Sequence, residues 1–146
     1  MGRYLLRVFT AVLTFAIGVV ISPIRFTPEI LAHSTVTDGG GAYAVARYKS
    51  SYFVNLWRSS EVYDTPEKAD QVFQDRLQRA VKVLERAPKF NEGGAKVGDR
   101  AVAIFYSREH GEQYACVLWT EGRVLIEVYS SSLLHVLDFE KHQVND

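Results

Sequence analysis

The chain has 146 residues, enough for one ordinary domain, and 47% of them are hydrophobic, which suffices to form a core. Its 17 basic and 17 acidic side chains cancel, so the bulk charge indicates no strong electrostatic partner, and we expect no nucleic-acid partner. The single cysteine, Cys116, excludes an internal disulfide and is expected to be a small buried residue on a strand.

The first 25 residues predict an export signal. Arg3 and Arg7 precede an apolar run over residues 8–21, the order of positive and apolar segments that such signals have. The apolar stretch is also long enough to cross a ~30 Å hydrocarbon core as a helix. The sequence EILAHS places Ile30 where a signal peptidase prefers a small residue. We therefore expect a retained signal-anchor, a transmembrane helix over residues 1–25, rather than a cleaved leader.

The predicted anchor sets the expected location of the chain. More arginines precede the apolar run than follow it, which predicts a single pass through the cytoplasmic membrane with the N-terminus inside. A cleaved signal would instead give a secreted protein. Residues 26–41 contain Pro28 and three consecutive glycines and are expected to form a flexible tether. Residues 42–146 are then an extracytoplasmic domain.

The domain is expected to begin with β-structure and continue into a long helix. Residues 42–63 are rich in aromatic and β-branched side chains of alternating character, which indicates a strand pair or one long bent strand. Residues 64–88 carry apolar side chains three and four positions apart, the spacing of an amphipathic helix. Thr65 is the expected N-cap with Pro66 in the first helical position, and Pro88 is expected to end the helix.

Three further strands are expected in the second half, in the sequences RAVAIFYS, EQYACVLWT and RVLIEVYS. Their connections, REHG and EG, have hairpin length, so the strands should form an antiparallel meander. A short helix over SLLHVLDFEKH, capped by Ser131 or Ser132, should follow. The expected fold class is α+β, with an antiparallel sheet of about four strands, one long helix packed on one face and a short C-terminal helix, preceded by the N-terminal transmembrane helix.

Part of the domain resembles a known group of proteins. The sequences VGDRAV and WTEGRVL, within roughly residues 60–140, resemble small bacterial extracytoplasmic domains of uncharacterised function that carry a membrane anchor or a lipoprotein leader. The resemblance implies an extracytoplasmic location and a similar architecture. It implies no catalytic residues.

The sequence contains no nucleophile elbow, phosphate loop or zinc-protease motif. His135, Asp138 and His142 fall on one face of the predicted terminal helix, and two imidazoles with a carboxylate can bind zinc. No convincing further ligand accompanies these weak metal candidates. We therefore expect no metal, no other cofactor and no enzymatic activity.

The residues expected to bind a partner are aromatic or basic. Tyr52, Phe53 and Trp57 belong to an aromatic-rich region, and such side chains are favoured in protein interfaces. If Tyr52 faces the core, Phe53 and Trp57 face outward, although a slip of one residue in strand register would invert this. Arg79 and Lys82, with Arg86 and Lys89, form a basic stripe along the predicted long helix, which would suit anionic headgroups or an acidic partner.

The predicted function is a non-catalytic binding or interaction module, tethered to the membrane, that has a protein partner in an assembly of the cell envelope. The alternative is a small-ligand-binding domain, because a curved sheet and a helix can enclose an apolar pocket lined by aromatic side chains. A void between the long helix and the sheet would favour the pocket, whereas a filled core with an exposed aromatic strand would favour protein docking. The sequence leaves the oligomeric state open.

Overall fold

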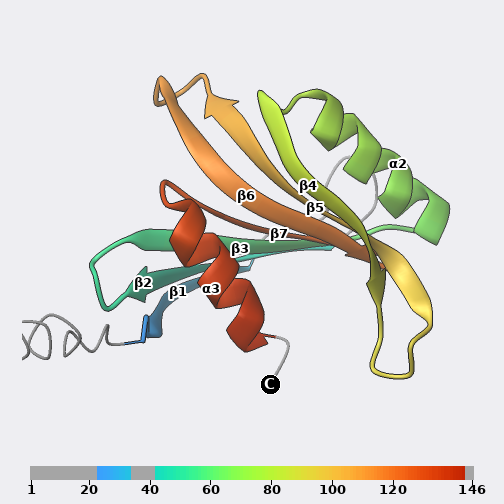
Figure 1. The fold of residues 1–146 in the computed structure, drawn as a ribbon, viewed down its shortest axis with the longest axis horizontal. Coiled ribbons are helices and arrows are strands. Elements are labelled where there is room, and N and C mark those ends of the chain that lie inside the picture. Colours follow the sequence, from blue (N-terminus) through green and yellow to red (C-terminus); the bar gives the residue numbers. More distant parts are fainter. Residues whose placement is uncertain (1–22, 34–41, 144–146) are drawn as a thin grey trace, which may run out of the picture.

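A strongly twisted antiparallel sheet forms the centre of the computed structural model, which describes residues 23–33 and 42–143 (Figure 1). Within this part of the chain the sheet has seven strands in the order β1-β2-β3-β7-β6-β5-β4. The elements in chain order are β1 (Phe26–His33), β2 (Tyr43–Ser50), β3 (Asn55–Val62), α2 (Pro66–Gln78), β4 (Lys82–Phe90), β5 (Lys96–Ser107), β6 (Glu112–Glu121), β7 (Val124–Ser130) and α3 (Leu133–Gln143).

The connections explain this strand order. After β3 the chain crosses through α2 to the opposite edge of the sheet, where β4 lies, and the meander β4-β5-β6-β7 then returns strand by strand until β7 pairs with β3. The predicted meander of three strands is confirmed as β5, β6 and β7. Gly111 and Gly122 have positive φ angles of 67° and 58° in the two hairpin turns, a conformation that glycine adopts without strain.

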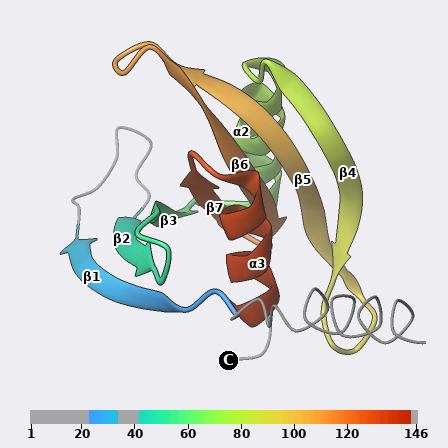
Figure 2. The same ribbon diagram turned by 60° about the vertical axis from the view of Figure 1, so that its left-hand side comes forward.

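The two helices cover opposite faces of β6 and β7 (Figure 2). On one face, Phe73 of α2 packs in a cluster with Leu118 of β6. On the other face, Phe139 of α3 packs with Leu56 and Val117. The centre of the molecule is therefore a three-layer arrangement, helix, sheet and helix, in which both sheet faces are buried.

The start of α2 agrees with the sequence prediction. The hydroxyl of Thr65 accepts a hydrogen bond of 3.1 Å from the backbone N–H of Lys68, and Pro66 is the first helical residue. Ala69, Phe73 and Leu77 recur every four positions and are buried against the sheet. The N-cap and the apolar face of the helix are thus confirmed.

The end of α2 corrects the prediction, because the helix stops at Gln78 and residues 82–90 form β4. The spacing of Ala80, Val81 and Leu84 fits a helix, but the backbone of this segment pairs with β5 instead. The N–H of Val81 donates to the carbonyl of Ile104 at 2.8 Å, and the antiparallel register continues to Phe90. Pro88, expected to end the helix, lies within this edge strand, where a missing N–H is tolerated.

The predicted tether also contains a strand. Residues 26–33 form β1, which pairs with β2 at the other edge of the sheet, with a register irregularity between Pro28 and Ile30. The sequence predicts about four strands. With β1, β4 and the two separate strands β2 and β3, the sheet has seven strands in the described part of the chain. The expected fold class is therefore wrong in the size of the sheet and in the length of the helix.

The predicted N-terminal transmembrane helix is not borne out. Among residues 23–33 and 42–143 no helix is long and apolar enough to cross a bilayer. Residues 1–22, which carry most of the predicted signal-anchor, lie outside the described residues, and residues 23–25 precede β1 without helical structure.

The C-terminal helix is confirmed as α3, over Leu133–Gln143. Ser132 caps it, since its hydroxyl accepts a hydrogen bond of 3.5 Å from the N–H of His135. The guanidinium of Arg100 on β5 holds the carboxylate of Glu140 through two bonds of 2.5 and 2.6 Å. This ion pair and the apolar cluster around Phe139 fix α3 on its face of the sheet.

Candidate functional site

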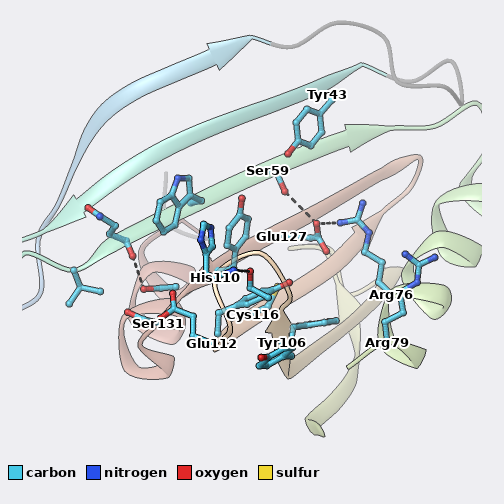
Figure 3. Close-up of a pocket in the computed structure, with 18 of the residues that line it drawn as sticks. Tyr43, Ser59, Arg76, Arg79, Tyr106, His110, Glu112, Cys116, Glu127 and Ser131 are labelled. Carbon is cyan, nitrogen blue, oxygen red and sulfur yellow. Dashed lines mark hydrogen bonds and ion pairs between the residues drawn. The ribbon is translucent and has the colours of Figure 1, made fainter. Parts of the chain in front are cut away.

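A cavity of about 1030 Å³ lies beside α2 on the sheet face that this helix covers in part (Figure 3). Its floor is formed by residues of β3, β5, β6 and β7, and residues of α2 and β2 complete its inner end. The turn between β2 and β3 and the hairpin between β5 and β6 border its outer end. A volume of this size matches that of pockets that bind small molecules.

Four aromatic side chains cross the floor from strand to strand, and we call them the aromatic row: Trp57, Tyr129, Tyr114 and Phe105. Trp57 and Tyr129 are direct cross-strand partners, with ring centroids 5.8 Å apart and planes inclined by 10°. Phe105 and Tyr114 are likewise direct partners, at 5.6 Å and 18°. Tyr114 and Tyr129 join the two stacked pairs at 5.8 Å and 58°.

Tyr129 and Tyr114 occupy the middle of the aromatic row. Tyr129 has Trp57 on one side and Tyr114 on the other, and Tyr114 has Tyr129 and Phe105. Each tyrosine ring therefore has an aromatic neighbour on either side, and both residues also line the cavity. Neither hydroxyl has a hydrogen-bond partner within the described part of the chain. Burial raises the pKa of Tyr129 to about 12 and also raises that of Tyr114, so both hydroxyls stay protonated donors.

A charged network closes the inner end of the cavity. The guanidinium of Arg76 on α2 donates to the carboxylate of Glu127 on β7 and, at 2.5 Å, to that of Glu61 on β3. The hydroxyl of Ser59 donates to Glu127 at 3.5 Å, and the hydroxyl of Tyr63 donates to Glu61. One arginine thus ties the helix to two strands, and Figure 3 shows Ser59 and Arg76 converging on Glu127.

Burial and ion pairing have different net effects on the pKa values of Glu127 and Arg76. Burial raises the pKa of the Glu127 carboxyl above its usual range, and the charge of Arg76 opposes this in part. Burial also disfavours the charged form of Arg76, but the carboxylates of Glu127 and Glu61 prevail and raise its pKa. The difference follows from depth, because the Glu127 side chain is 12% exposed and that of Arg76 30%.

Cys116 also lines the cavity, directly opposite Tyr129 of β7 and two residues after Tyr114 on β6. It is 2% exposed, and burial raises the pKa of its thiol well above the usual value. The thiol rather than the nucleophilic thiolate is therefore favoured. The sequence prediction of a small buried cysteine on a strand is confirmed.

A strained turn lies at the mouth of the cavity. Phe53 is 81% exposed and has a φ angle of 62°, which non-glycine residues rarely adopt. The buried hydroxyl of Ser50 holds the turn by accepting hydrogen bonds from the N–H groups of Tyr52 at 3.2 Å and Val54 at 3.1 Å. The turn thus presents an aromatic side chain beside the opening.

The predicted binding residues are placed at different sites. Trp57 and Phe53 border the cavity, as does Arg79, whose side chain extends from the last turn of α2 beside that of Arg76 (Figure 3). Tyr52 lies instead against His135 of α3, with ring centroids 6.1 Å apart. Lys82 is exposed on β4 and does not line the cavity.

The expected basic stripe does not exist as one helical surface, because its members after Arg79 belong to β4. Arg86 donates a hydrogen bond of 2.7 Å to Gln74 of α2, whereas Lys89 lies 4.9 Å above the ring of Trp119, which belongs to the α3 side. The basic side chains therefore point to both faces of the sheet.

Two of the three weak metal candidates lie together, since Nδ1 of His142 is 3.6 Å from Oδ2 of Asp138. The Nδ1 atom of His135 lies 2.7 Å from the hydroxyl of Ser132, and Nδ1 of His142 donates to the backbone carbonyl of Asp138 at 2.7 Å. Over residues 23–33 and 42–143, no group of three histidine, cysteine or acidic side chains is placed to hold a metal ion.

The sequence patterns do not identify Tyr114 and Tyr129 of the aromatic row or the network around Arg76 as parts of a site. One signal was available: the alternation in RVLIEVYS places Glu127 and Tyr129 on the same face of a strand. A carboxylate between apolar neighbours on such a strand requires a partner, and Arg76 lies on the face of the helix that contains Phe73. The pairing of β3 with β7 brings the residues of the site together. Because these strands are far apart in the sequence, no pattern of neighbouring residues predicts this pairing.

Comparisons with protein-family models, with curated proteins and with solved structures found no match to this chain.

Proposed function

We propose that this domain binds a small organic molecule in the cavity that lies beside α2 on the sheet. The observation that carries the proposal is the cavity of about 1030 Å³, whose floor presents two tyrosine hydroxyls that have no partner in the described structure. A concave site that combines aromatic side chains with a few polar groups is typical of ligand pockets. Of the two binding functions that the sequence allows, the cavity beside the helix favours the small ligand over protein docking.

The cavity amends one part of that prediction, because its lining is not purely apolar. Tyr114, Tyr129 and Ser59 place hydroxyls along the floor, and Arg79 adds a charge at the inner wall. The ligand therefore combines a ring or another apolar body with hydrogen-bonding groups. No covalent role is proposed for any side chain, since the thiol of Cys116 is held in its protonated form.

Tryptophan fluorescence tests the proposal directly. The chain contains two tryptophans, and Trp119 belongs to the core on the α3 side, so Trp119→Phe leaves Trp57 as the reporter in the cavity. The neutral dye N-phenyl-naphthylamine, titrated into this full-length variant, should quench Trp57 in a saturable manner. Quenching that rises linearly without saturation would contradict the proposal.

A pair of blocking variants locates the binding. Ser131→Tyr adds a bulky side chain at an exposed position that lines the cavity, whereas Gln113→Tyr adds the same bulk at an exposed position that does not. We expect Ser131→Tyr to weaken dye binding and Gln113→Tyr to leave it unchanged. Equal affinities of the two variants would place the dye outside the cavity.

A further inference from the structure

We infer that the ligand of this cavity is an anion, bound through a carboxylate or another oxyanion by Arg79. The inference rests on the proposed binding function and adds the chemical class of the ligand. It follows from which polar groups of the cavity are already engaged and which are not.

Arg76 and Arg79, the two arginines that line the cavity, differ in whether their side chains have partners in the described part of the chain. Both guanidinium arms of Arg76 are engaged, one by Glu127 and one by Glu61. Arg79, three residues later, lines the same cavity and is exposed, and in the described part of the chain its side chain has neither an ion-pair nor a hydrogen-bond partner. One positive charge at the cavity is thus unmatched.

The carboxylates of the inner end are committed to groups of the protein. Oε2 of Glu127 accepts from Arg76 and from Ser59, while Oε1 and Oε2 of Glu61 accept from Arg76 and Tyr63. A cationic ligand would have to compete with Arg76 for these oxygens. An anionic ligand meets no such competition at Arg79.

The remaining groups of the floor also favour an acceptor-rich ligand. The hydroxyls of Tyr114 and Tyr129 are protonated donors without partners in the described structure. Glu112, the first residue of β6, lies at the other end of the cavity from Arg79 (Figure 3). A guanidinium and two phenols together can bind an oxyanion and its neighbouring oxygen atoms.

A matched pair of dyes tests the inference in the full-length Trp119→Phe protein. Anilinonaphthalene sulfonate and N-phenyl-naphthylamine share one aromatic body, and only the first carries an anionic group. We expect Arg79→Gln to weaken binding of the sulfonate dye about fivefold, as for a partly exposed charge pair, and to change binding of the neutral dye less than about twofold. Arg79→Lys should retain most of the affinity for the sulfonate dye, because the charge remains.

Arg123→Gln serves as the control, since it removes an exposed arginine in the turn before β7 that does not line the cavity. It should change neither affinity. If Arg79→Gln leaves both affinities unchanged or lowers both equally while Trp57 quenching stays saturable, the inference of an anion is overturned and the binding function stands. If neither dye quenches Trp57 saturably, both fail.

Discussion

Arg76 on α2 and Glu127 on β7 form an ion pair at the inner end of the cavity, where the carboxylate is almost completely buried. Glu61 on β3 and Ser59 complete the partners of this pair. Because the three charged residues belong to three elements, the pair determines where the helix lies on the sheet. The ion pair thus joins α2, which forms one wall of the cavity, to the strands that form its floor.

The first prediction concerns the loss of Arg76. Arg76→Met leaves Glu127 buried without its counter-charge, and we expect the free energy of unfolding to fall by about 3 kcal/mol. Chemical denaturation measures this change. The matched control is Arg79→Met, one turn later on the same helix, which removes an arginine without a described partner and should change stability by less than about 0.5 kcal/mol. Equal effects of the two substitutions would show that the ion pair does not hold the helix.

The second prediction concerns alkaline pH. The pKa of Tyr129 is raised by burial to about 12, whereas the unfolded chain ionises near the ordinary value of 10.0. Between these values the folded state binds more protons, so the stability that Tyr129 contributes is present below pH 10.0 and is lost as the pH rises towards 12. Tyr129→Phe should therefore make stability fall less steeply over this interval, as measured by denaturation at a series of pH values.

At neutral pH the same variant reports on the hydroxyl itself. Because that hydroxyl has no described hydrogen-bond partner, Tyr129→Phe should change the free energy of unfolding by less than about 1 kcal/mol. A larger loss at neutral pH, or an unchanged slope at high pH, would contradict the placement of the phenol in the cavity.

The third prediction concerns Gly98 on β5, which approaches the backbone of β6 very closely. A Cβ at this position would lie 2.0 Å from the carbonyl oxygen of Thr120 and 2.5 Å from its hydroxyl. Gly98→Ala should therefore lower stability by about 2–3 kcal/mol, since the strands must move apart. Gly93→Ala is the control, because the nearest atom to its added Cβ is 3.4 Å away, and its effect should stay within about 0.5 kcal/mol. Thermal unfolding compares the two variants.

The fourth prediction concerns the strained turn at the mouth of the cavity. Phe53 holds a φ angle of 62° and is 81% exposed, so its side chain contributes little burial to offset the strain. Phe53→Gly should raise the free energy of unfolding by about 0.5–1 kcal/mol. Phe53→Ala keeps the strain and should bring no gain. A gain of equal size in both variants would show that the side chain, rather than the backbone, is unfavourable.

Local signals predict most elements correctly. The N-cap at Thr65, the hairpins at Gly111 and Gly122 and the terminal helix after Ser132 each depend on a few neighbouring residues, and each is confirmed. In these cases the residues themselves satisfy the backbone groups involved, so that no distant partner is needed.

The errors occur where distant pairing overrides a local pattern. Residues 79–88 fit a helix by spacing, yet the chain forms β4 from Lys82 onward, because β5 offers a strand edge to which Val81 can donate. The composition around Pro28 predicts a tether, but residues 26–33 pair with β2 as an edge strand, a position that tolerates proline. Tyr129 meets Trp57 only because β7 pairs with β3, and the sequence separation of this contact hides it from any local pattern.

The early end of α2 has a consequence for the space above the sheet. Had the helix continued to Pro88, as its apolar spacing predicts, it would have been about ten residues and roughly 15 Å longer. The added turns would have extended from the inner wall, past Arg79, over the part of the floor that is now open. Instead the chain leaves the helix and adds an edge strand, so one change of backbone conformation both widens the sheet and vacates the room that a ligand needs.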